Sequence, residues 1–110
     1  MAKIILDEVG IKKVRQLRQN GDLDQAERML LNAEPSPAVA DELRKTESEK
    51  AKIAKKARNW RKVIQYLEFY NTYAKRVLPY CMKTANQEPP QHSPTDQKLL
   101  EEAKIRLNIK

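Results

Sequence analysis

The stretch Lys50–Lys83, KAKIAKKARNWRKVIQYLEFYNTYAKRVLPYCMK, contains the only Trp, the only Phe, the only Cys and all four Tyr of the 110-residue chain. Seven of its first thirteen residues are basic. From Trp60 to Cys81 apolar residues recur at spacings of three and four, which is the period of an amphipathic α-helix. Asn59 stands just before this run and is a typical helix N-cap. We therefore expect one helix to end before Asn59 and a long helix to begin after it.

The rest of the chain is built from helix-forming residues and carries clear breaks. Lys, Arg, Glu, Gln, Ala and Leu dominate, and Gly occurs only twice. The breaks fall at Asn20-Gly21, Pro35-Ser36, Arg58-Asn59 and residues 86–94. They predict an all-α protein of five helices in a single domain, residues 1–110. Its parts are a hairpin at about residues 7–33, a second hairpin at about 37–85, a loop at 86–93 and a last helix at 94–108.

The helix starts carry recognisable capping residues. Asp22 precedes Gln25 by three positions, a spacing that allows a capping box. Ser36 and Ser93 each precede a proline, which fits the first position of a helix because its missing amide costs nothing there. Only two residues separate the first two helices, so these should run antiparallel.

Four local features lead to further expectations. Residues 2–6 allow either an extended arm or the start of the first helix. The polar segment 44–50, RKTESEK, is expected to project beyond the core, whereas Ile53 and Ala57 are expected on the inner face of the third helix. Pro79 should kink or interrupt the long helix near residues 75–79, because proline removes one hydrogen bond and clashes with the preceding turn.

Positive charge is concentrated in one third of the chain. The net charge is +7, while residues 50–83 hold ten basic residues and a single acid, Glu68. We define the basic cluster as the six residues Lys52, Lys55, Lys56, Arg58, Arg61 and Lys62. Local carboxylates could come only from residues 41–49 or 101–102. A localised excess indicates a surface for acidic partners, although a lysine-rich solvated helix face is the alternative.

The hydrophobic and capping pattern repeats after 37 residues. Leu23 aligns with Trp60, Ala26 with Val63 and Leu30 with Leu67, as expected for stacked helical hairpins. The segment NGDLDQAERML, residues 20–30, resembles the turn and second helix of a tetratricopeptide repeat (TPR), and AKKARNWRKVIQYLEFY resembles the same motif without its glycine. The resemblance covers about residues 9–74. It implies two TPR-like hairpins, a capping helix from Pro94 to Asn108, and a groove that binds peptides or proteins.

The sequence contains no recognisable catalytic or metal-binding pattern. We expect Cys81 to be a small buried hydrophobe and His92 to be a solvated loop residue. One His and one Cys are too few for a zinc site, and Gly10 and Gly21 do not form a phosphate-binding loop. We therefore expect a protein that is not an enzyme, with no catalytic residues, no metal and no cofactor.

The single Cys excludes an internal disulfide, and the longest apolar runs are far shorter than the roughly 18 residues that span a bilayer. We expect a soluble cytoplasmic protein without a membrane partner.

Three tyrosines, Tyr66, Tyr73 and Tyr80, recur every seven residues and so lie nearly in line on the long helix. Such a line either belongs to the core or forms a partner-facing groove, because a tyrosine ring buries area while its hydroxyl stays hydrated. Together with the basic cluster, these tyrosines are our candidate partner-binding residues. We expect an acidic protein or peptide as the partner. RNA or DNA binding and homodimer formation are the alternatives.

Overall fold

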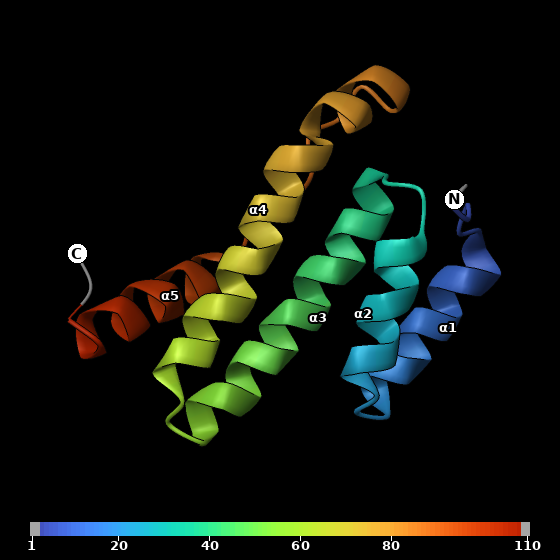
Figure 1. Cartoon of the computed structure of the whole chain (residues 1–110). Helices are drawn as coiled ribbons and strands as arrows, with labels where there is room; N and C mark the ends of the chain where they lie inside the picture. Colours follow the sequence, from blue (N-terminus) through green and yellow to red (C-terminus); the bar gives the residue numbers. More distant parts are fainter. Residues whose placement is uncertain (1–2, 109–110) are drawn as a thin grey trace.

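The computed structural model describes residues 3–108, which form five α-helices and no β-sheet (Figure 1). The predicted all-α class and the four predicted breaks are confirmed. The helices are α1 (Glu8–Gln19), α2 (Leu23–Asn32), α3 (Pro37–Lys56), α4 (Trp60–Thr84) and α5 (Pro94–Arg106).

Four helices begin at a side-chain cap. The side chains of Asp7, Ser36, Asn59 and Ser93 each accept a hydrogen bond from the amide three residues later, which satisfies one free N–H of the first turn. Asp22 makes no such bond, so the predicted capping box at the start of α2 is wrong. Its backbone has ψ of 59°, outside the extended conformation that an N-cap usually adopts.

The α1–α2 and α3–α4 turns have the same hydrogen-bond pattern, displaced by 37 residues. In the first, Gly21 donates to Arg18 O and Asp22 to Leu17 O. In the second, Arg58 donates to Lys55 O and Asn59 to Ala54 O. Both are Schellman endings, which place the residue after the helix in the left-handed conformation. Gly21 has φ of +84°, and Arg58 adopts φ of +55° at the equivalent position although it is not a glycine.

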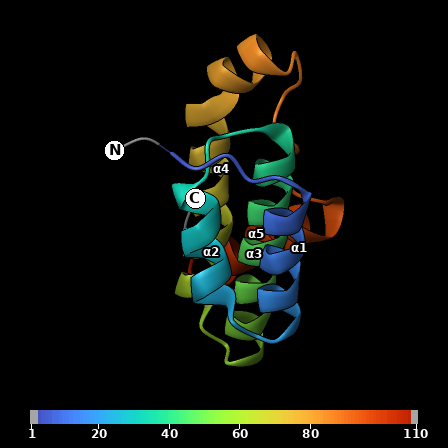
Figure 2. The same ribbon diagram turned by 90° about the vertical axis from the view of Figure 1, so that its right-hand side faces the viewer.

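Each helix packs against its neighbour in the sequence, and α1 also packs against α3. Figure 2 shows α1 and α2 in front, α3 and α4 behind them, and α5 crossing behind α4. In both views the α3–α4 turn extends further than the α1–α2 turn (Figures 1 and 2). The last turns of α3 and the first turns of α4 therefore extend beyond the first hairpin.

The N-terminal segment before α1 is an extended arm, which decides between the two expectations for residues 2–6 as far as the described residues reach. Ile4 N donates to Asn32 O at 3.1 Å, and Glu34 N donates to Ile4 O at 2.7 Å. These bonds form an isolated parallel bridge to the α2–α3 connection. The arm thus ties the start of the chain to the end of the first hairpin.

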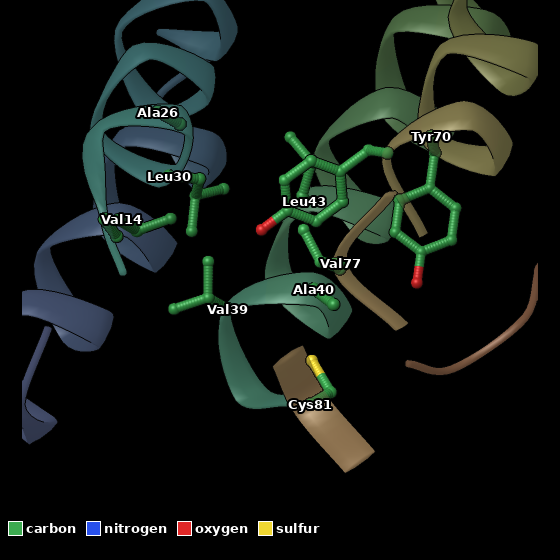
Figure 3. Close-up of a cluster of buried hydrophobic side chains, with 11 residues drawn as sticks. Val14, Ala26, Leu30, Val39, Ala40, Leu43, Tyr70, Val77 and Cys81 are labelled. Carbon is green, nitrogen blue, oxygen red and sulfur yellow. The ribbon is translucent and has the colours of Figure 1, made fainter. Parts of the chain in front are cut away.

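The apolar side chains form two clusters. The larger lies between α1, α2, α3 and the C-terminal half of α4, and Figure 3 shows nine of its side chains labelled, from Val14 to Cys81. The smaller joins the end of α3, the start of α4 and α5, with Leu67, Leu99 and Ala103 at its centre. The expectation that α5 covers one face of the second hairpin agrees with this packing.

Two expectations about the long helices are corrected. The polar segment 44–50 does not project, because Thr46, Glu47, Ser48 and Lys50 are buried. The reason is the central position of α3, which packs against α1, α2 and α4 at once. The long helix α4 is not interrupted at Pro79 but continues to Thr84.

Candidate binding surface

The six residues of the basic cluster surround the α3–α4 turn, and all six are exposed. Lys52, Lys55 and Lys56 come from the last turns of α3, Arg58 from the turn itself, and Arg61 and Lys62 from the first turn of α4. The prediction that the cluster is exposed is therefore confirmed. The Asn59 cap and the left-handed Arg58 bring the two helix ends together, so cations that are ten residues apart in sequence share one corner of the molecule.

Within residues 3–108, none of these six cations has a carboxylate within 4.0 Å. The acids that could have neutralised them bind elsewhere. Glu42 pairs with Arg15 and Arg18 of α1, at 3.2 and 2.8 Å. Glu102 pairs with Arg106 one turn further along α5. The positive charge of the cluster is consequently not matched inside the protein.

The helix dipoles act on this cluster in opposite senses. Lys55 and Lys56 lie at the C-terminal end of α3, where the partial negative charge of the helix favours cations. Arg61 and Lys62 lie in the first turn of α4, which contains no acidic residue and where cations are disfavoured. Helix capping therefore accounts for the lysines of α3 but not for the basic residues of α4.

A shallow hollow of about 330 Å³ lies next to the basic cluster, and we call it the notch. The α1–α2 turn, the end of α3 and the start of α4 enclose it. Its walls are mainly apolar and are formed by Leu23, Ile53, Ala54, Ala57 and Tyr66, with Lys62 on the cluster side.

The sequence placed Ile53 and Ala57 on the inner face of the third helix, and this was wrong. Ile53 is 59% exposed and Ala57 is also exposed. The helical period alone gives the side of the helix but not how far the neighbouring hairpin reaches. The α1–α2 turn stops beside Ile53, so nothing in the described chain covers this side of the last turn of α3.

A group of buried charges lies between α2 and α3, just above the notch. Lys50 Nζ contacts Asp24 Oδ1 at 2.7 Å and Glu27 Oε2 at 3.1 Å. Burial opposes the charge of Lys50, but these hydrogen bonds outweigh it and raise its pKa, while Lys50 lowers the pKa of Asp24. The ammonium group also lies 5.4 Å from the ring centre of Tyr66, which makes a cation–π contact.

Glu47 is the exceptional member of this group. It is 1% exposed, and neither of its carboxylate oxygens has a hydrogen-bond partner among the described residues. Burial first, and then the neighbouring Glu27 and Asp24, raise its pKa to about 9 from an ordinary value of 4.5, although Lys50 opposes this effect. Glu47 is therefore protonated at neutral pH.

The three aligned tyrosines do not form a continuous exposed line. Tyr73 is 7% exposed and belongs to the larger core cluster, and burial raises its pKa to about 12. Tyr66 is half-buried beside the notch, and Tyr80 donates a hydrogen bond to Glu34. The expectation of a partner-facing tyrosine line is thus wrong at Tyr73, because α3 covers this part of α4. Tyr66 remains beside the basic cluster.

His92 is not a solvated loop residue, as the sequence suggested, but is 5% exposed. Its Nε2 atom lies 2.8 Å from Leu67 O, and its ring packs edge-on against Tyr70 at 5.0 Å. Since a carbonyl oxygen can only accept, Nε2 carries the hydrogen. Tyr70 also donates to Pro90 O, so these two side chains fasten the 86–93 loop to α4.

Cys81 is buried in the larger core cluster, as predicted, and burial raises the pKa of its thiol. A protonated, buried thiol is a poor nucleophile. Residues 3–108 contain no group of three or more His, Cys, Asp or Glu side chains placed to hold a metal ion. In the same range, no helix combines the length and apolarity that a bilayer crossing requires.

Comparison with protein-family models, with curated proteins and with solved structures found no match to this chain. Conclusions about function therefore depend on the geometry and electrostatics of the chain itself.

Proposed function

We propose that this protein is a non-enzymatic binding module whose basic cluster binds an acidic protein or peptide. The observation that carries the proposal is the exposure of all six cations of the cluster without a single ion pair. A localised positive surface of this kind concentrates and orients negatively charged partners.

The aromatic side chains favour a protein over a nucleic acid. Binding of single strands uses exposed aromatic rings on which bases stack. Trp60 begins α4 and packs on the smaller core cluster, and the Arg106 guanidinium covers its ring at 4.7 Å. Tyr73 is buried. The aromatic rings nearest the cations are thus already engaged, and an acidic polypeptide needs only the charges.

The arrangement of the hairpins supports a TPR-like relationship as part of this proposal. The two inter-helix turns share one hydrogen-bond pattern at an offset of 37 residues, and α1 packs on α3 as the first helices of successive repeats do. Stacked helical hairpins commonly provide extended surfaces for macromolecules. The second hairpin is considerably longer than the first, which makes the α3–α4 turn project with its cations.

The test is a charge reversal with a matched control. The variant K52E/K55E/K56E changes three residues of the cluster, and K12E/K13E/K98E makes the same change in net charge at exposed positions elsewhere. Both should keep the wild-type circular dichroism. In pull-downs from the native host at 0.15 M salt, we expect the cluster variant to lose the partner at least about tenfold. The control variant should retain it.

The alternatives give different results in the same experiment. Release of the bound material by nuclease, with a log–log salt slope that falls by about one for each lost phosphate contact, would favour nucleic acid. A doubled mass by light scattering, abolished by the cluster variant, would favour a homodimer. Undiminished binding by the cluster variant would refute a functional role for the basic cluster.

A further inference from the structure

The notch adds an apolar contact site to the charges of the basic cluster. Ile53 is the only large apolar side chain of α3 that is strongly exposed, and it lies between Lys52 and Lys56 along the helix surface. The wall beside it is completed by Leu23, Ala54 and Tyr66. An exposed apolar site rimmed by charge is typical of an interaction surface.

The size of the notch indicates what it can hold. A volume of about 330 Å³ is at the lower end for ligand sites in proteins, which typically reach up to about 1,000 Å³. The notch is also open to solvent along one side between the two inter-helix turns. One or two aliphatic side chains of a bound segment fit this shape better than an entire ring-containing cofactor.

The charges around the notch are asymmetric. Lys62 lines it on the side of the basic cluster, and Lys56 lies one turn beyond Ile53, both without ion pairs to described residues. On the opposite side stands Asp24, whose carboxylate is bound by Lys50 at 2.7 Å. Carboxylates of a partner are therefore attracted to one side of the notch and repelled from the other.

We infer that the notch is the anchor site for an acidic peptide segment, with an aliphatic side chain on Ile53 and Tyr66 and neighbouring Asp or Glu residues on Lys56 and Lys62. This inference rests on the proposed function and specifies the chemistry of the partner. A nucleic-acid backbone would satisfy the cations but would leave Ile53 without an apolar counterpart. Only a segment that carries both kinds of group complements the whole surface.

The experiment uses a displayed library of random 12-residue peptides, selected on the full-length protein in 0.15 M salt. We expect enrichment of peptides in which Leu, Ile, Met or Phe stands beside several Asp or Glu residues on one side. An enriched peptide is then labelled with fluorescein and its affinity is measured by fluorescence anisotropy. Replacing its aliphatic residue by Ser should weaken binding about tenfold or more, as loss of an interface anchor does.

Two protein variants localise the anchor. Ile53→Ala removes most of the apolar surface of the notch but keeps a good helix former on an exposed face, so the fold is retained. Ile105→Ala is the matched control, because Ile105 is 77% exposed on α5 and does not line the notch. We expect a loss of about tenfold or more for the first variant and less than twofold for the second.

The possible failures are distinguishable. If K52E/K55E/K56E abolishes binding of the enriched peptide but Ile53→Ala does not, the anchor site is wrong and the proposed function stands. If the charge-reversed variant binds the peptide normally, the proposed function itself is wrong. Failure to enrich any acidic peptide with an aliphatic residue, or complete displacement of the peptide by a 12-nucleotide RNA at similar concentration, would overturn the inference.

Discussion

Replacing Glu47 by Gln should remove a pH dependence of stability that the wild-type protein carries through neutral pH. Glu47 is buried, its oxygens lack partners within the described chain, and its pKa is raised to about 9. In the unfolded chain the pKa returns to about its ordinary value of 4.5. Between these two values the native state holds a proton that the unfolded state has lost.

The sign follows from proton linkage. Stability falls with rising pH wherever the native state binds more protons than the unfolded state. For Glu47 this window extends from about pH 4.5 to about pH 9. One proton is worth about 1.4 kcal/mol per pH unit, so between pH 6 and pH 8 the free energy of unfolding should decrease by up to about 2.7 kcal/mol. Gln has the shape of the protonated side chain but does not titrate.

The assay is urea unfolding followed by circular dichroism at 222 nm, at pH 6, 7 and 8. Relative to wild type, Glu47→Gln should gain stability progressively over this range. Glu49→Gln is the control, because Glu49 is on the same helix but exposed, and it should follow the wild-type dependence. Parallel pH profiles for wild type and Glu47→Gln would show that Glu47 ionises normally and would refute the argument.

Three other substitutions probe the packing. Trp60→Ala should lower the free energy of unfolding by about 3 kcal/mol, since a large aromatic ring leaves the smaller core cluster, and an unchanged urea midpoint would place Trp60 on the surface. Tyr70→Phe should cost about 1–3 kcal/mol, because buried Pro90 O loses its donor, and amide hydrogen exchange should accelerate in the 86–93 loop; unaltered exchange there would argue against the tether. Arg18→Ala should destabilise by about 3 kcal/mol by leaving Glu42 buried with fewer partners, whereas Glu42→Leu should cost clearly less; equal losses in thermal or urea unfolding would contradict this account.

Much of the fold could be predicted because its determinants are local. The Ser-Pro and Asn59 starts, the Gly21 ending and the three-four spacing of apolar residues all act within one or two helical turns. These features placed the five helices correctly. Arg58 shows where local rules become weak: it adopts the conformation of Gly21 at the equivalent turn, so the second turn carried no glycine to reveal it.

The failures were those of environment rather than of periodicity. The segment 44–50 is polar, and its burial depends on α1, α2 and α4 surrounding α3, which no window of the sequence contains. Ile53 was assigned correctly to one side of α3, but the length of the first hairpin decided its exposure. His92 was misjudged because its partner, Leu67 O, is a backbone atom 25 residues away.

The same dependence on the tertiary structure explains why the basic cluster became meaningful only in three dimensions. The sequence showed an excess of cations but could not show where the acids go. In the folded protein the carboxylates lie at helix–helix contacts: Glu42 bridges α3 to α1, Glu27 joins α2 to Lys50, and Glu68 joins α4 to Lys104 of α5 at 2.9 Å. Because these acids hold the helices together, they cannot also neutralise the projecting α3–α4 turn. The positive surface is therefore a consequence of how the fold uses its acids, and a partner that supplies carboxylates to this turn would complete the charge balance that the fold leaves open.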